Sequence, residues 1–141
     1  MTDDRRERGL AKMSEVYGWE VQDGPGDFFG ITVDHLFAEI WTRPGLTLRD
    51  RRLLLLGLLV GRGMQDVADI QIGAALRRAE MTPDELREIA IFLTHYAGWP
   101  SGAQLSMQVE KLIREHARAE RAKQAETEAE SAAARPPATS D

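Results

Sequence analysis

Two side chains that can exchange protons, Glu88 and His95, stand seven residues apart in a segment with helical periodicity. On a helix this spacing separates them by about 10.5 Å along the axis, so a small ligand would fit between their side chains. Ile91 and Phe92 flank the pair, which indicates a pocket wall or a second packing surface. We take His95 as the candidate general acid, with Glu88 beside it. The alternative is a partly exposed or subunit-interface histidine paired with a carboxylate.

Gln71 is a polar residue on an apolar helical stripe. The other members of that stripe are Met64, Val67, Ala74 and Arg78, with Ile70 beside it. Its amide group could donate a hydrogen bond to a substrate carbonyl, although it transfers no proton at neutral pH. The alternative is a buried glutamine bonded to a neighbouring backbone or subunit.

Arginines gather ahead of and at the start of a leucine-rich segment: Arg43, Arg49, Arg51 and Arg52. Arg43 or Arg49 could hold a substrate carboxylate through two parallel hydrogen bonds. Alternatively, these arginines pair with Asp50 or with acids of a neighbouring subunit.

Several aromatic residues are candidates for lining a substrate pocket, and core packing is the alternative for each. They are Trp41, Phe92, Trp99 and the Phe28-Phe29 pair.

The remaining titratable residues favour no metal or thiol chemistry. His35 and Glu39 are four residues apart and lie opposite an apolar stripe, so we expect a solvated ion pair, and His116 receives no role. No histidine pair has a metal-ligand spacing, and the chain has no cysteine, which removes disulfides, thiolate ligands and cysteine nucleophiles. We therefore expect no metal. The net charge of −5 argues against a nucleic-acid partner.

The elements that position these residues are helical almost throughout, which predicts an all-α fold of about six helices. The expected helices run over about 3–17, 27–41, 47–62, 65–78, 82–96 and from about 101 onward. Thr47 with Asp50, and Thr82 with Glu85, read as capping boxes, and Gly98-Trp99-Pro100 is expected to end the fifth helix. Leu53 to Leu56 make the third helix apolar on every side, which indicates that other subunits cover part of it.

The chain divides into a charged N-terminal tail or helix start (1–9), one helical domain (10–116), and a fraying helix with a disordered tail (117–141), because only alanine and polar residues follow His116. The longest apolar stretch, Leu53 to Val60, is far shorter than the roughly 20 residues that cross a bilayer. No signal peptide is evident, and we expect a cytoplasmic protein without a membrane partner.

Four segments carry a resemblance to a known family. They are FAEIWTRPGLTLRDR (37–51), Ala74 to Leu76 followed by TPDELREI (82–89), and YAGWP (96–100). In order and spacing they resemble the landmarks of the carboxymuconolactone decarboxylase family, over about Leu10 to Glu115. The resemblance implies an all-α bundle of the alkyl hydroperoxidase D-like type that assembles into trimers or hexamers in bacterial cytoplasm.

The chain departs from the family pattern at its reactive positions. The peroxide-reducing branch carries a Glu ahead of C-x-x-C-x-x-x-H, and those places fall here on Arg52, Met64, Val67 and Gln71. The decarboxylase branch usually has a His where this chain has Gln71, and often a His or Gln where it has Phe92.

The resemblance implies a cofactor-free reaction, because the family's substrate conjugates its departing carboxylate to a lactone carbonyl and so serves as its own electron sink. The expected function is therefore a lyase acting on a small carboxylated lactone or related conjugated acid. His95 would be the acid, Gln71 the carbonyl donor and Arg43 or Arg49 the anchor. The alternative is a non-catalytic oligomer that binds a small molecule or a protein partner. A thiol peroxidase would need a thiol that the chain lacks.

Overall fold

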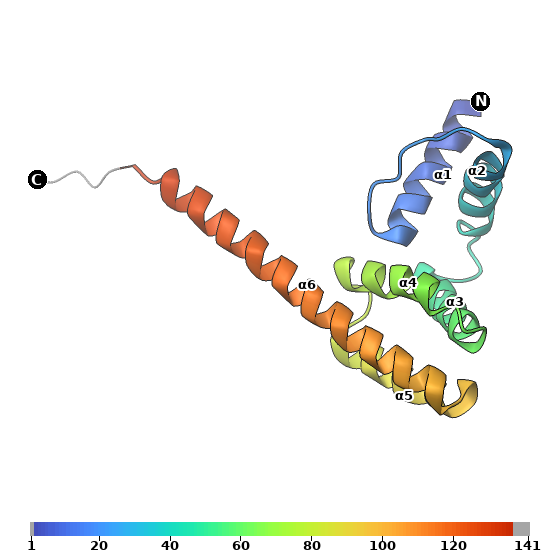
Figure 1. Ribbon diagram of the computed structural model, residues 1–141. Coiled ribbons are helices and arrows are strands. Elements are labelled where there is room, and N and C mark those ends of the chain that lie inside the picture. The colour runs from blue at the N-terminus through green and yellow to red at the C-terminus, as the bar shows by residue number, and fades with distance from the viewer. Residues whose placement is uncertain (1, 137–141) are drawn as a thin grey trace, which may run out of the picture.

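The computed structural model describes residues 2–136, and over this range the chain is built from helices with no strand (Figure 1). This agrees with the all-α prediction. In chain order the elements are α1 (Thr2–Tyr17), α2 (Asp27–Ile31), the π-helix η1 (Thr32–Ile40), α3 (Leu48–Gly61), α4 (Gln65–Arg77), α5 (Pro83–Ala97) and α6 (Trp99–Ala133).

Local sequence signals set the starts of α3 and α5. The Thr47 hydroxyl accepts from the backbone N–H of Asp50 at 3.0 Å, and the Thr82 hydroxyl accepts from that of Glu85 at 3.1 Å. In both cases the carboxylate of the acid accepts a hydrogen bond from the backbone N–H of the threonine, which completes the predicted capping boxes. Pro83 fits the first turn of α5 because the missing N–H of proline has no helical partner there.

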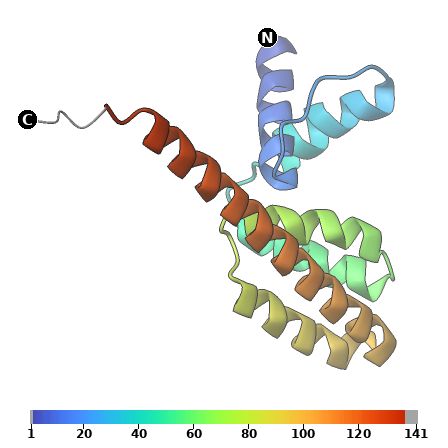
Figure 2. The same ribbon diagram turned by 60° about the vertical axis from the view of Figure 1, so that its left-hand side comes forward.

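Two apolar clusters form, and they share no residue. The first joins α1 to η1 through Met13, Val16, Val33 and Phe37. The second joins α3, α4, α5 and α6; its largest fully buried side chains are Leu56, Ile72, Leu86 and Leu105. Figures 1 and 2 show α1 and α2 on one side of the molecule and the α3–α6 bundle on the other.

Arginines of α3 and α4 join these two parts at the C-terminal end of α1. Arg52 donates to the carbonyl of Val16 at 2.8 Å, and Arg77 donates to the carbonyls of Tyr17 and Gly18 at 3.0 and 3.1 Å. Guanidinium groups suit this position because the last carbonyls of a helix lack helical partners and carry partial negative charge.

The leucine-rich helix α3 is only partly covered within one chain. Leu56, Leu59 and Val60 are buried, whereas 64% of Leu54 and 56% of Leu58 are exposed. The predicted cover from other subunits therefore stays a prediction, and the surface that would need it is Leu54 and Leu58.

The last helix differs from the prediction at its start. Gly98, with φ of 99°, makes the break after α5, but Trp99 and Pro100 already belong to the first turn of α6 rather than to a loop before it. A proline in the first turn removes no helical hydrogen bond, so it starts a helix as readily as it ends one.

The second half of α6 continues as a regular helix to Ala133, with every residue from Arg118 to Pro136 exposed. As predicted, this stretch buries nothing within the chain. The predicted disorder falls mainly on residues 137–141, which lie outside the described range.

Candidate active site

A shallow groove lies between the end of α5 and the start of α6, and it contains two of the residues singled out from the sequence. His95 and Trp99 line it together with Ile91, Thr94 and Ser106, and small residues form its floor. Its volume is about 240 Å³. The groove is thus large enough for a small acid and is mainly apolar.

The close approach of the two helices beneath the groove depends on Gly102. A Cβ at this position would meet the Thr94 hydroxyl at 2.0 Å, so no larger residue fits without a shift of Thr94. The Thr94 hydroxyl in turn donates to the Ala90 carbonyl at 2.7 Å, which fixes its direction.

The tautomer of His95 follows from its one hydrogen bond. Its Nδ1 lies 2.8 Å from the carbonyl oxygen of Ile91, and because a carbonyl only accepts, Nδ1 carries the proton of that bond. The imidazole edge meets the Trp99 ring with centroids 6.1 Å apart and planes at 75°. The Nε2 atom is therefore the one available for proton exchange with a ligand in the groove.

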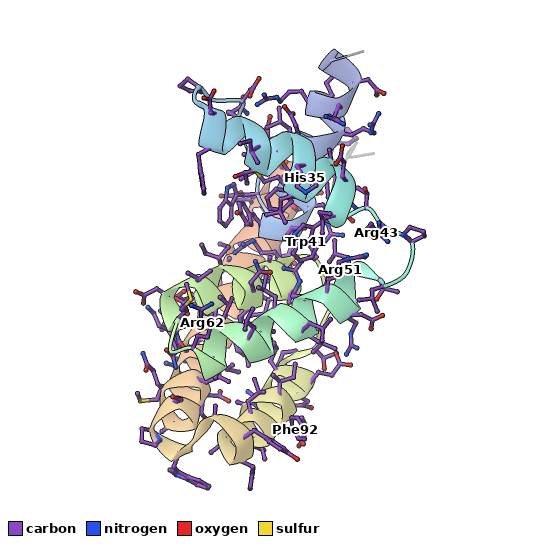
Figure 3. All side chains as sticks on the ribbon, turned by 90° about the vertical axis from the view of Figure 1, so that its right-hand side faces the viewer. His35, Trp41, Arg43, Arg51, Arg62 and Phe92 are labelled. Atoms are coloured by element: carbon purple, nitrogen blue, oxygen red, sulfur yellow. The ribbon has the colours of Figure 1, made fainter. Side chains whose placement is uncertain are left out.

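Glu88 and Phe92 do not line this groove. Glu88 is exposed two helical turns before His95. Phe92 is 62% exposed and packs against Tyr96 with ring centroids 5.3 Å apart. Figure 3 shows the Phe92 ring directed outward from α5.

Gln71 lies in the interior, away from the groove. It is 3% exposed, and its side-chain oxygen accepts from Arg52 at 2.7 Å. This matches the alternative expected from the sequence, a buried glutamine bonded to a neighbour, although here the neighbour is a side chain. Its amide nitrogen would have to leave this setting to reach a ligand beside His95.

The sequence placed Arg52 among the arginines at the start of α3, but its burial was not predicted. It is fully buried, and besides Val16 and Gln71 it contacts the Glu80 carboxylate through an ion pair. The signal was in the periodicity, because Arg52, Leu56 and Leu59 follow the i, i+4, i+7 spacing of one helix face.

The other arginines occupy three different settings. Arg49 pairs with Glu85 at 3.0 Å, at the start of α5. Arg51 donates to the carbonyl of Arg43 at 2.7 Å and to that of Leu46, which braces the loop before α3. Arg43 is exposed, and no acid within residues 4–136 lies within ion-pair distance of it. Of the two predicted anchors, Arg43 has the freer guanidinium.

Trp41 belongs to the first apolar cluster. Its ring stacks on Phe37 with centroids 6.2 Å apart and planes at 14°. Figure 3 shows Trp41, Arg43 and Arg51 near the junction of η1 with α3, whereas Phe92 lies near the bottom of the view. Within a single chain, neither Trp41 nor Arg43 lines the groove that contains His95.

A second hollow lies between α1 and η1, with a volume of about 770 Å³. Its charged lining includes Arg5, Arg6, Asp34, His35 and Glu39. His35 and Glu39 form the expected ion pair at 2.7 Å, and this hydrogen bond, with the nearby charge of Arg5, holds the pKa of Glu39 below its ordinary value. Each arginine here already pairs with an acid, so the hollow offers no free anchor. The π-helical form of η1 had no sequence signal that we recognised.

The part of the chain that the structure describes contains no group of three or more His, Asp or Glu side chains placed to hold a metal ion. None of the described helices is both long and apolar enough to span a membrane.

Comparison with known families decides the relationship that the sequence suggested. The model of the carboxymuconolactone decarboxylase family matches residues 26–106. The chain belongs to this family. The match in this carboxymuconolactone decarboxylase family member begins just before α2 and ends within α6, so α1 and the second half of α6 lie outside it.

Two curated relatives of this family member are decarboxylases. The chain is 27% identical to a 4-carboxymuconolactone decarboxylase of Acinetobacter baylyi over 124 residues, which cover 82% of this chain and 92% of the relative. It is 32% identical to a nitrosuccinic acid decarboxylase of Metarhizium robertsii over 80 residues, 55% of this chain and 53% of that protein. No solved structure matches this family member significantly.

Proposed function

We propose that this protein is a cofactor-free decarboxylase of a small conjugated or nitro-substituted carboxylic acid. The observation that carries the proposal is the alignment over 92% of a 4-carboxymuconolactone decarboxylase. The second relative acts on a different acid but is also named a decarboxylase.

The two named substrates share one chemical property, which defines the proposed substrate class. In carboxymuconolactone a lactone carbonyl can accept the electron pair left by carbon dioxide, and in nitrosuccinic acid a nitro group on the same carbon can do so. In either case the C–C bond to the carboxylate breaks and its electron pair moves into the acceptor group. A proton then returns to carbon. Such a reaction needs no resident electron sink, only positioning, charge stabilisation and an acid.

His95 is the proposed acid. Because the Ile91 carbonyl holds the proton on Nδ1, the transferable proton of the imidazolium would be the one on Nε2. Trp99 supplies an apolar wall beside it, which favours loss of the carboxylate charge as carbon dioxide.

No arginine or lysine of the described residues lines the groove, so the carboxylate that the substrate keeps would find no such cation there within one chain. The proposed assembly supplies one. Arg49 contacts Glu85, which lies ten residues, or about 15 Å along α5, from His95. Arg43 has no acid partner within the described residues and belongs to the loop before α3. We propose that the protein works as a homo-oligomer, a trimer or hexamer, in which Arg43 of one copy serves the groove of another.

The exposed apolar side chains of α3, α5 and α6 support an assembly of this kind, since a lone chain would leave them in water. They are Leu54, Leu58, Ile91, Phe92, Tyr96, Trp99 and Met107. As part of the same proposal the oligomer is cytoplasmic, in keeping with a chain that has no cysteine for disulfides.

The test is turnover of 4-carboxymuconolactone, nitrosuccinic acid and related acids by the purified protein, followed as released carbon dioxide. We expect His95→Ala to lower kcat by roughly 10²- to 10⁴-fold, the usual contribution of a general acid. The matched control is His35→Ala, which removes an exposed histidine on η1 and should leave turnover unchanged.

Two results would overturn the proposal. One is full activity in His95→Ala. The other is no turnover of any acid while the same acids raise the melting temperature, which would favour the alternative of a non-catalytic binder.

A further inference from the structure

The second half of α6 is a helix without any partner in its own chain. From Arg118 to Ala133 every residue is exposed, a length of about 24 Å. Figures 1 and 2 show this half extending away from the rest of the molecule. It also lies beyond residue 106, where the match to the family model ends, so the common family fold does not require it.

The charges of this exposed half are segregated along its length. Residues 117–123 contain Arg118, Arg121 and Lys123 against Glu120, which leaves a net charge of +2. Residues 124–133 contain three glutamates and no basic residue, a net charge of −3. The division falls close to Gln124.

This order is unfavourable for an isolated helix. The C-terminal end of a helix carries partial negative charge, which acidic residues there destabilise. The last turn of α6 has no basic residue to offset it. A partner that brings positive charge to Glu126, Glu128 and Glu130 would remove this cost.

We propose that the exposed half of α6 pairs in antiparallel orientation with the same segment of a second copy of the chain. A two-fold axis near Gln124 would place the basic part of each helix beside the acidic part of the other, and would do so twice. A parallel pair would instead set like charges side by side. Ala122, Ala125 and Ala129 follow a three- and four-residue spacing, so the two backbones could approach closely.

Single cysteines provide a direct test, because the chain has none of its own. In the proposed pair Ala125→Cys lies on the alanine stripe and opposite itself, so it should form a disulfide between copies in the full-length protein under mild oxidation. Ala132→Cys, seven residues further along the same stripe, is the matched control: its two copies would lie about 20 Å apart in an antiparallel pair but adjacent in a parallel one. Absence of the Ala125→Cys cross-link, or equal cross-linking at Ala132→Cys, would overturn the proposal.

Charge reversal in the Ala125→Cys background tests the electrostatic part. The acidic-part variant carries Glu126→Lys, Glu128→Lys and Glu130→Lys, and the basic-part variant carries Arg118→Glu, Arg121→Glu and Lys123→Glu. Each variant alone should lose the cross-link, and a mixture of the two should regain it as a heterodimer. Circular dichroism should report a helix content close to that of the parent, since all six side chains are exposed.

The mixing experiment also separates this contact from other self-association. If both variants cross-link alone as the parent does, charge does not direct the pairing and the inference fails. If neither the mixture nor the variant with all six reversals cross-links, the partner of this helix is something other than a second copy.

Discussion

Arg52 donates a hydrogen bond of 2.7 Å to the side-chain oxygen of Gln71 inside the protein. The family resemblance places these two residues where the peroxide-reducing branch has its Glu and the last His of its motif. In this chain neither can relay a proton at neutral pH, since a guanidinium does not release its proton and a carboxamide neither gains nor loses one. In this chain the two positions contact each other, and their chemistry is hydrogen bonding within the core.

The first prediction concerns the stability supplied by Arg52. Arg52→Ala should lower the free energy of unfolding by about 3–5 kcal/mol, because it leaves the nearly buried Glu80 without its charge partner and Gln71 without its donor. Arg52→Met should cost less than Arg52→Ala, since it retains more of the side-chain volume. Urea unfolding at a fixed protein concentration provides the measurement.

The control for this prediction is Arg49→Ala, which removes an exposed ion pair to Glu85. Pairs of that kind contribute about 0–1 kcal/mol. Equal losses from Arg49→Ala and Arg52→Ala would show that the buried network adds no particular stability.

The second prediction concerns the proposed assembly. Leu54→Glu combined with Phe92→Glu should shift sedimentation toward smaller species, because the two side chains are 64% and 62% exposed in one chain and would be buried in an oligomer. We expect the double substitution to weaken the free energy of association by at least about 2 kcal/mol, which raises the dissociation constant more than tenfold. Losses of this size are found for residues at the centre of an interface.

The control for the assembly is Phe28→Glu, which changes an exposed aromatic residue on α2. We expect it to leave the sedimentation profile unchanged. A wild-type protein that is monomeric at micromolar concentration would contradict the proposed interface, as would a profile that responds only to Phe28→Glu.

The third prediction concerns acid stability through Glu85. The backbone N–H of Thr82 and the charge of Arg49 hold the pKa of this carboxyl below its ordinary value. The ionised form therefore stabilises the folded state above the ordinary pKa of a glutamate, and this contribution is lost as the pH falls through the lowered value.

Glu85→Gln isolates the charge, because glutamine can still complete a capping box. Its melting temperature should lie below that of the wild type at neutral pH, and the two curves should converge in acid. Glu7→Gln, at an exposed position on α1, should track the wild type at every pH. Parallel curves for Glu85→Gln and the wild type down to pH 3 would refute the assignment.

Helix positions could be predicted where the signal was local. Thr47 and Thr82 cap the helices expected of them, because a capping box involves residues only three apart. The start of α6 was misplaced by two residues because Pro100 suits the first turn of a helix as well as the end of one. The register of η1 depends on packing against α1, which no short stretch of sequence encodes.

The candidate site was less accessible to sequence reasoning for the same physical reason. His95 and Trp99 are four residues apart and both line the groove, although the sequence paired His95 with Glu88 and not with Trp99. The relation of Arg43 or Gln71 to His95 depends on how separate helices pack. Gln71 was recognised as a polar residue on an apolar stripe, but its partner Arg52 lies 19 residues away on α3.

The separation of the two apolar clusters gives the first forty residues a degree of independence. The helix α1 is joined to α3 and α4 largely through hydrogen bonds from guanidinium groups to carbonyls, and the exposed loop 42–47 is the covalent connection. The unit from α1 to η1 can therefore detach without opening the larger cluster. Amide hydrogens of α1 and η1 would then exchange through a partial opening of lower free energy than global unfolding. The same detachment would allow two neighbouring chains to exchange the unit from α1 to η1 by domain swapping.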